Sequence, residues 1–116
     1  MSQPVVHFEV VGKDAKRLQD FYGKAFDWRM EPAGPDYAMV HPAGEDGLAG
    51  GVGAAMDGSE GRVTFYVGVP NLEAALKKIE ALGGQTAFGP ADVPGGPRIA
   101  HFTDPEGHRV GLVQTA

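Results

Sequence analysis

The sequence predicts an α+β protein built from two βαβββ modules, and three observations carry this prediction. Two β-rich runs, Val6–Val11 and Val63–Gly68, open the two halves of the chain with similar alternating patterns. Each run is followed, at the same spacing, by a residue type that caps helices well, Asp14 in the first half and Asn71 in the second. After each predicted helix the chain breaks into short strand-like runs separated by Gly and Pro. The chain therefore repeats one pattern twice.

The two predicted helices are amphipathic. Apolar residues recur at helical spacing, namely Ala15, Leu18, Phe21, Tyr22, Ala25 and Phe26 in the first helix and Leu72, Ala75, Leu76, Ile79 and Leu82 in the second. The pair Gly83-Gly84 follows the second helix and supplies a stop signal, because glycine readily adopts the left-handed conformation that ends helices. Trp28, just after the first helix, is expected to pack in the core, although an indole there could also stack on a ligand.

Three strands are predicted after each helix. They are Asp27–Glu31, Tyr37–His41 and Leu48–Ala55 in the first half, and Gln85–Phe88, Arg98–Thr103 and Arg109–Gln114 in the second. The segment Asp104-Pro105-Glu106-Gly107 has the chemistry of a tight turn. We therefore divide a single domain, residues 1–116, into module one (4–56), a linker (57–61) and module two (62–115).

Composition excludes several classes of function. The chain has no cysteine, which rules out disulfides and thiolate metal sites, so the fold must depend on packing. Its net charge is −5 and its basic residues are scattered, so no basic footprint for nucleic acid is present. No apolar run is long enough to cross a membrane, and the first residues lack the features of a signal peptide. We expect a soluble cytoplasmic protein.

Two further signatures resemble a known family. The run Val6-His7-Phe8-Glu9-Val10, followed by Phe21–Trp28, is similar to the first module of glyoxalase and bleomycin-resistance proteins. The run Phe102–Leu112, which contains the Asp-Pro-Glu-Gly turn, is similar to their final hairpin. The whole chain thus resembles the vicinal oxygen chelate superfamily, which also includes extradiol dioxygenases, and within it a branch of small glyoxalase-related proteins. The resemblance implies a glyoxalase-like fold, in which two modules with curved mixed sheets enclose a cavity.

Strand alternation indicates which side chains such a cavity would receive. Because successive strand residues point to opposite faces, His7 and Glu9 lie on the face away from Phe8 and Val10, which we expect under the helix. The predicted cavity residues are His7, Glu9, Thr64, Tyr66, Arg98 and His101. His7 and Glu9 could form an acid–base pair or a wall of the cavity. Tyr66 could contact a ligand or fill the core, and Arg98 could bind a carboxylate or remain solvated. No catalytic residue is predicted.

Metal-dependent members of the superfamily hold a divalent ion with His or Glu side chains on the first and last strand of each module. In this chain the corresponding positions are His7, a glycine within 50–53, Thr64 and Gly111. Only His7, one of the four, keeps a side chain of the ligand type. Too few ligands are left for a typical catalytic metal site. We expect no cofactor. The alternative is a divalent ion on a rearranged site around His7 and Glu9, for which His41, His101 and His108 are further candidate ligands.

Three functions remain open from the sequence. The preferred hypothesis is a metal-independent small-molecule binding protein of the glyoxalase and bleomycin-resistance type. The alternative is a metal-dependent lyase, isomerase or dioxygenase of glyoxalase type that uses the site around His7 and Glu9. A third possibility is an accessory subunit with a vestigial cavity. Since sheets of this kind leave edges that tend to find partners, we also expect a homodimer.

Overall fold

The structure, a computed structural model, describes residues 2–55 and 59–115. The chain forms two compact units, each described by itself below: the first unit spans His7–Thr64, and the second unit comprises Phe65 onward together with the residues before His7. The unit boundaries fall within the first and the fifth strand. Part of the predicted linker 57–61, namely 57 and 58, lies outside the described residues, and residue 61 already belongs to a strand.

The observed elements follow the predicted order. They are β1 (Val5–Gly12), α1 (Ala15–Phe26), β2 (Met30–Pro32), β3 (Tyr37–Val40) and β4 (Gly50–Ala54), then β5 (Gly61–Val69), α2 (Leu72–Ala81), β6 (Gln85–Asp92), β7 (Arg98–Thr103) and β8 (Arg109–Gln114). Within residues 2–55 and 59–115 no helix is long and apolar enough to cross a membrane.

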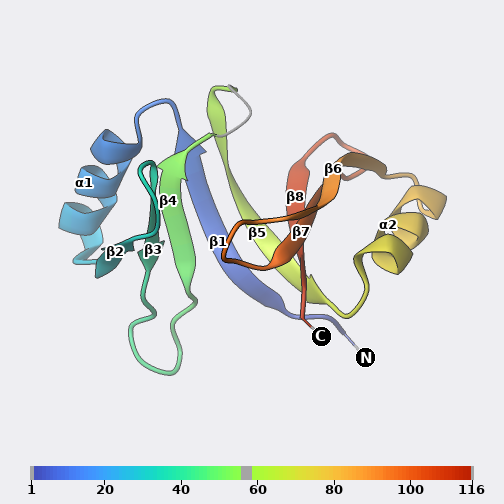
Figure 1. The fold of residues 1–116 in the computed structure, drawn as a ribbon, viewed down its shortest axis with the longest axis horizontal. Helices are drawn as coiled ribbons and strands as arrows, with labels where there is room; N and C mark the ends of the chain where they lie inside the picture. Colours follow the sequence, from blue (N-terminus) through green and yellow to red (C-terminus); the bar gives the residue numbers. More distant parts are fainter. Residues whose placement is uncertain (1, 56–58, 116) are drawn as a thin grey trace. The chain divides into compact units, whose positions relative to one another are not determined.

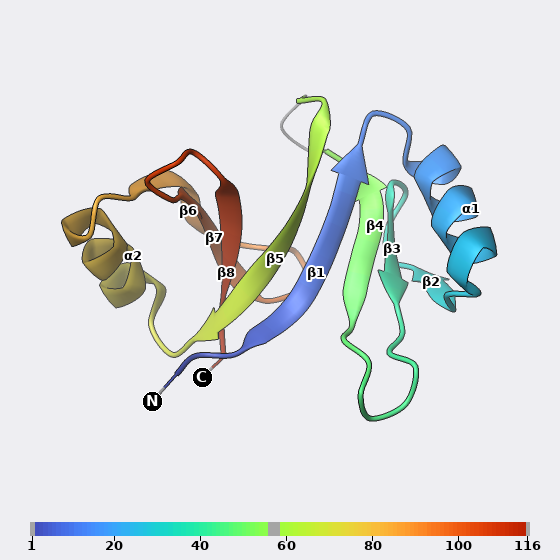
Figure 2. The same ribbon diagram turned by 180° about the vertical axis from the view of Figure 1, so that it is seen from behind.

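Both halves repeat one strand topology, which confirms the predicted α+β fold. In the first, the strand order is β2-β3-β4-β1, with β1 parallel to β4 and the other neighbours antiparallel. In the second, the order is β6-β7-β8-β5, with β5 parallel to β8 and the other neighbours antiparallel. Figures 1 and 2 show α1 beside the first set of strands and α2 beside the second.

Two strand boundaries differ from the prediction for local reasons. We placed a strand start at Asp27, but this residue ends α1 in the left-handed conformation, with φ of 56°, and β2 begins only at Met30. We ended the sixth strand at Phe88, whereas its pairing with β7 shifts register and continues to Asp92 opposite Arg98. Neither the helix cap nor the register shift is marked by the alternation of apolar residues on which the prediction relied.

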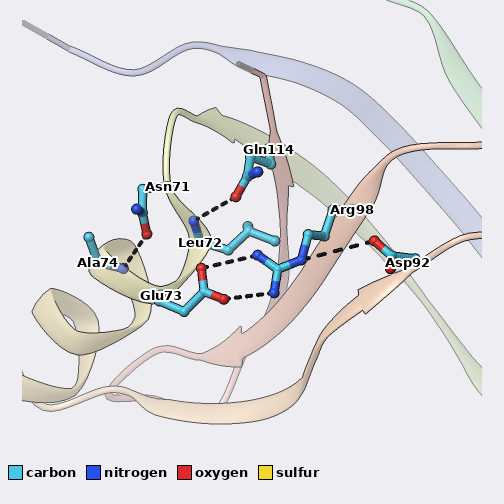
Figure 3. Close-up of polar contacts among 7 residues, drawn as sticks. All are labelled: Asn71, Leu72, Glu73, Ala74, Asp92, Arg98 and Gln114. Carbon is cyan, nitrogen blue, oxygen red and sulfur yellow. Dashed lines mark hydrogen bonds and ion pairs between the residues drawn. The ribbon is translucent and has the colours of Figure 1, made fainter.

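The predicted N-caps form in both helices. The Asp14 carboxylate accepts a hydrogen bond from the Arg17 backbone N–H at 3.0 Å, and the Asn71 side-chain oxygen accepts one from the Ala74 N–H at 2.8 Å (Figure 3). These bonds satisfy backbone donors that have no partner within the helix. The caps therefore fix where each helix starts.

Each helix buries one face of its own sheet. In the first unit α1 covers a cluster made by Val10, Val40 and Val52, against which Phe8, Leu18, Tyr22, Trp28 and Met30 pack. The Trp28 and Tyr22 rings stack with centroids 5.5 Å apart, so the indole has the predicted packing role. In the second unit α2 covers a cluster made by Val69, Leu72, Leu76, Ala100 and Leu112. The opposite face of each sheet, which we call the helix-distal face, receives the remaining strand side chains.

Replacement of Leu72 by alanine tests whether α2 is held by burial. Leu72 is completely buried, so Leu72→Ala should lower the free energy of unfolding by about 2–5 kcal/mol through lost apolar contact and a residual cavity. Leu82, which follows the same helix, is 72% exposed and provides the matched control. Denaturant unfolding should show a loss for Leu82→Ala of less than about 0.5 kcal/mol. Equal losses for the two variants would contradict this account of the core.

Candidate functional site

A histidine, a tyrosine and a glutamate form a hydrogen-bonded chain on the helix-distal face of the first unit. The Tyr37 hydroxyl donates to Glu9 Oε2 at 2.9 Å, and His7 Nε2 lies 3.1 Å from the same hydroxyl oxygen. A tyrosine hydroxyl has one hydrogen, which Glu9 receives, so Tyr37 must accept from the N–H at His7 Nε2. His7 then carries its proton on Nε2 and presents an unprotonated Nδ1. We call these residues the first cluster.

Burial sets the protonation state of His7. Desolvation lowers the pKa of the imidazole below its usual value, and the nearby negative charge of Glu9 opposes that change without cancelling it. Neutral His7 is therefore the form that the first unit favours. In this neutral form the single ring proton lies on Nε2, as the hydrogen-bond directions require.

A second cluster occupies the helix-distal face of the second unit. The Tyr66 hydroxyl oxygen lies 2.8 Å from Nε2 of His101, which is 8% exposed. On the other side of the same imidazole, Arg109 approaches Nδ1 with Nε at 3.1 Å and Nη2 at 2.8 Å. The Phe88 ring lies against His101 with centroids 5.6 Å apart. These four residues, from β5, β6, β7 and β8, form what we call the second cluster.

Glycines make room for both tyrosines. In the register of the parallel strand pairs, Gly51 lies opposite Glu9 and Gly111 lies opposite Tyr66. A Cβ atom on Gly51 would collide with the ring and hydroxyl of Tyr37, and one on Gly111 would collide with the Tyr66 ring. Gly51 therefore has a packing role, because the absence of a Cβ atom leaves space for the Tyr37 ring.

Four of the predicted site residues belong to these clusters. His7 and Glu9 meet in the first, and Tyr66 and His101 meet in the second. Thr64 is buried in β5 at the end of the first unit. The other candidate histidines lie elsewhere on exposed segments, with His41 paired to Glu31 at 2.8 Å and His108 paired to Asp104 at 2.9 Å.

Arg98 does not join the second cluster, although we predicted it as a cavity residue. It lies three residues before His101 on β7, so the two side chains point to opposite faces of the sheet. Its guanidinium donates to both carboxylate oxygens of Glu73 on α2, at 3.1 and 2.7 Å, and lies 4.0 Å from Asp92 (Figure 3). Arg98 therefore ties the start of α2 to the sheet.

Sequence reasoning missed Tyr37, Arg109 and Phe88. Tyr37 follows a Pro-Asp turn and seemed to be only the first residue of a strand. Arg109 begins the strand after the Asp-Pro-Glu-Gly turn, and antiparallel pairing of β7 with β8 brings it near His101. A count of alternation through predicted strand pairs could have placed Tyr37 and Arg109 on the helix-distal faces, but not at hydrogen-bonding distance.

The donor set does not fit the divalent ion that the family resemblance implies. Among the residues that the structure describes, no group of three or more His, Asp or Glu side chains is gathered in an arrangement able to hold a metal ion. In the first cluster a tyrosine hydroxyl lies between His7 and Glu9. In the second, a guanidinium donates to His101 Nδ1, and a cation at this distance opposes binding of another cation.

Comparison with known proteins places the chain in a family. The fold repeats one βαβββ module twice, as the strand order shows. Residues 5–112 match the model of the Glyoxalase/Bleomycin resistance protein/Dioxygenase superfamily. The chain belongs to this superfamily, which confirms the resemblance found in the sequence. No curated protein sequence matches the chain.

Solved structures share the fold at low sequence identity. A structure described as NAD-dependent benzaldehyde dehydrogenase from Legionella pneumophila aligns over 95% of this chain and 98% of its own, with a TM-score of 0.71 and 16% identity. Methylmalonyl-CoA epimerase from Streptomyces coelicolor, in complex with 2-nitronate-propionyl-CoA, aligns over 99% of both chains at 0.70 and 19% identity. The Mycobacterium tuberculosis epimerase aligns over 97% and 87% at 0.66 and 14% identity. Likeness at these identities shows the fold alone.

The lowered pKa of His7 predicts a pH dependence of stability. Because the folded pKa is below the usual value of about 6.5, the unfolded chain binds this proton first as pH falls. Stability is therefore fully present above that value and decreases on acidification. Urea unfolding between about pH 5 and about pH 8 should show a shallower dependence in His7→Gln than in the unmodified protein. An unchanged slope in His7→Gln would contradict the prediction.

The seat of the Tyr66 ring can be tested with a double-mutant cycle. Gly111→Ala should lower the free energy of unfolding by about 1–3 kcal/mol, because its Cβ overlaps the ring. In a Tyr66→Ala background the same change should cost nothing or be slightly stabilising, since alanine suits a strand better than glycine does. Additive effects of the two substitutions in denaturant unfolding would show that the ring and the glycine do not interact.

Proposed function

We propose that this protein binds a small organic molecule without a metal ion, through the polar clusters on the helix-distal faces of its sheets. The observation that carries the proposal is the Tyr37 hydroxyl between His7 and Glu9. Nε2 of His7 and Oε2 of Glu9 are both hydrogen-bonded to this tyrosine hydroxyl. The arrangement is suited to hydrogen bonding rather than to coordination of an ion.

The two clusters favour different ligand groups. In the first, the side chains supply acceptor atoms, namely Nδ1 of the neutral His7 ring and the carboxylate oxygens of Glu9. Such atoms suit an ammonium, amide N–H or hydroxyl group of a ligand. In the second, Arg109 and Tyr66 supply donors, which suit a carbonyl or carboxylate oxygen. Low-dielectric surroundings strengthen both kinds of contact.

The alternative remains a metal-dependent lyase, isomerase or dioxygenase with a rearranged site. It is favoured by one observation, that His7 and Glu9 both reach the same hydroxyl and are therefore close together. A neutral imidazole and a carboxylate are ligand types that divalent ions accept. This function would require Tyr37 to move away and further ligands to be recruited.

Metal titration separates the two proposals. Chelator-stripped protein would be titrated calorimetrically with nickel, manganese, zinc and, without oxygen, ferrous iron, in parallel with His7→Ala. We expect heats no greater than those of the variant, because among residues 2–55 and 59–115 no group of three or more suitable ligands is gathered, and the first cluster contributes His7 and Glu9. Stoichiometric binding that is lost in His7→Ala would overturn the metal-independent function and direct the search toward enzymatic assays.

Ligand binding itself can be sought by thermal stabilisation. A panel of small amines, amides, hydroxy acids and carboxylic acids would be screened for compounds that raise Tm in a saturable manner. A ligand at one hundred times its Kd should add about 2.7 kcal/mol to the free energy of unfolding. In Glu9→Gln the apparent affinity for such a ligand should be at least about tenfold weaker, since a charge-assisted hydrogen bond is lost. The rise in Tm at a given ligand concentration should be smaller accordingly.

The control for that variant is Glu31→Gln, which removes an exposed carboxylate paired with His41 instead of one in the cluster. It should leave both Tm gain and affinity unchanged. If every stabilising compound raises Tm equally in Glu9→Gln, in Glu31→Gln and in the unmodified protein, the first cluster has no role in binding.

A further inference from the structure

The contacts of His101 define its proton positions. Two nitrogens of the Arg109 guanidinium, Nε and Nη2, approach the same ring nitrogen, Nδ1, at 3.1 and 2.8 Å. A guanidinium has donors only and stays charged at all pH values at which proteins fold. Nδ1 must therefore present its lone pair to Arg109. An N–H at Nδ1 would point a hydrogen at the hydrogens of the guanidinium.

The remaining ring nitrogen then carries the proton. A neutral imidazole has one N–H, so with Nδ1 unprotonated the hydrogen is on Nε2, which lies 2.8 Å from the Tyr66 hydroxyl oxygen. Tyr66 accepts this hydrogen bond. Its own hydroxyl hydrogen consequently serves a partner other than His101, since both atoms of a hydrogen bond cannot donate along the same line.

We infer that Arg109 is a positioning residue that fixes His101 as the neutral Nε2–H tautomer, so that His101 donates to Tyr66 and the Tyr66 hydroxyl hydrogen is directed away from the ring. A doubly protonated ring is disfavoured, because it would replace the acceptor at Nδ1 with a donor and set two cations against each other inside a nearly buried cluster. His101 then serves neither as a metal ligand nor as a base. It orients Tyr66.

The tautomer of His101 does not depend on the proposed function, because it follows from the contacts of the second cluster alone. The His7 ring of the first cluster carries the same Nε2 proton, but for another reason, since there the hydroxyl of Tyr37 is directed by a carboxylate. Only in the second cluster does a cation determine the tautomer.

The test is nitrogen NMR of the full chain labelled with ¹⁵N at histidine, near neutral pH. Long-range ¹H–¹⁵N spectra distinguish protonated from unprotonated ring nitrogens, and His101→Gln assigns the relevant signals. We expect an unprotonated Nδ1 and a protonated Nε2 with no averaging between them. A protonated Nδ1, or a doubly protonated ring, would overturn the inference from the spectrum of the unmodified protein alone.

Substitutions then identify the residue responsible. In Arg109→Met both nitrogen shifts should move toward each other, because the proton is no longer confined to Nε2, and Arg109→Lys should largely restore them by supplying one donor. Arg98→Met, which removes an arginine from the opposite face of the same sheet, should leave the His101 signals in place. Unchanged shifts in Arg109→Met would assign the tautomer to another cause and overturn the positioning role.

Failure of this inference and failure of the proposed function are distinguishable. Metal binding that depends on His7 would be detected by calorimetry and would not alter the His101 tautomer. Conversely, a wrong tautomer would be seen by NMR whether or not metal binds.

Discussion

The packing of one amphipathic helix on one face of each sheet is the interaction on which the other features depend. Leu72 and Leu76 of α2 close over Val69, Ala100 and Leu112, and Leu18 and Tyr22 of α1 pack against Val10 and Val52. Because strand side chains alternate, burial of one face decides which residues occupy the other. A slip of one residue in any strand would put the polar side chains under a helix. Burial of the apolar face therefore determines which residues make up both polar clusters.

The two clusters reach related chemistry with their residues on different strands. In the first unit the histidine is on the opening strand and the tyrosine on β3, whereas in the second unit the tyrosine is on the opening strand and the histidine on β7. Each pair is completed by a charged residue of opposite sign, Glu9 in one case and Arg109 in the other. The repeat of backbone pattern is thus accompanied by an inversion of hydrogen-bonding character, from acceptors to donors.

How far the sequence could predict this structure depends on the range of each interaction. Local signals were sufficient for the caps at Asp14 and Asn71, and for strands 98–103 and 109–114. The faces of His7 and Glu9 followed from alternation. The same rule would have separated Arg98 from His101, which are three positions apart, had it been applied to β7. The contacts of Tyr37 with Glu9 and of Arg109 with His101 could not be predicted, because they depend on strand register, which no short motif encodes.

The seating of tyrosine rings over glycines also bears on how such a protein could acquire a new chemistry in evolution. An acidic side chain at position 51 or 111 would collide with the ring already there, so the first substitution would be selected against through reduced stability. The ring would have to shrink before the new carboxylate could be accommodated. The effect of an acidic residue at the glycine position thus depends on whether the ring is present, which is epistasis between the two positions. The glycine and the tyrosine in each unit therefore constrain each other's replacement during evolution. An anionic side chain at position 51 or 111 requires that the tyrosine be replaced as well.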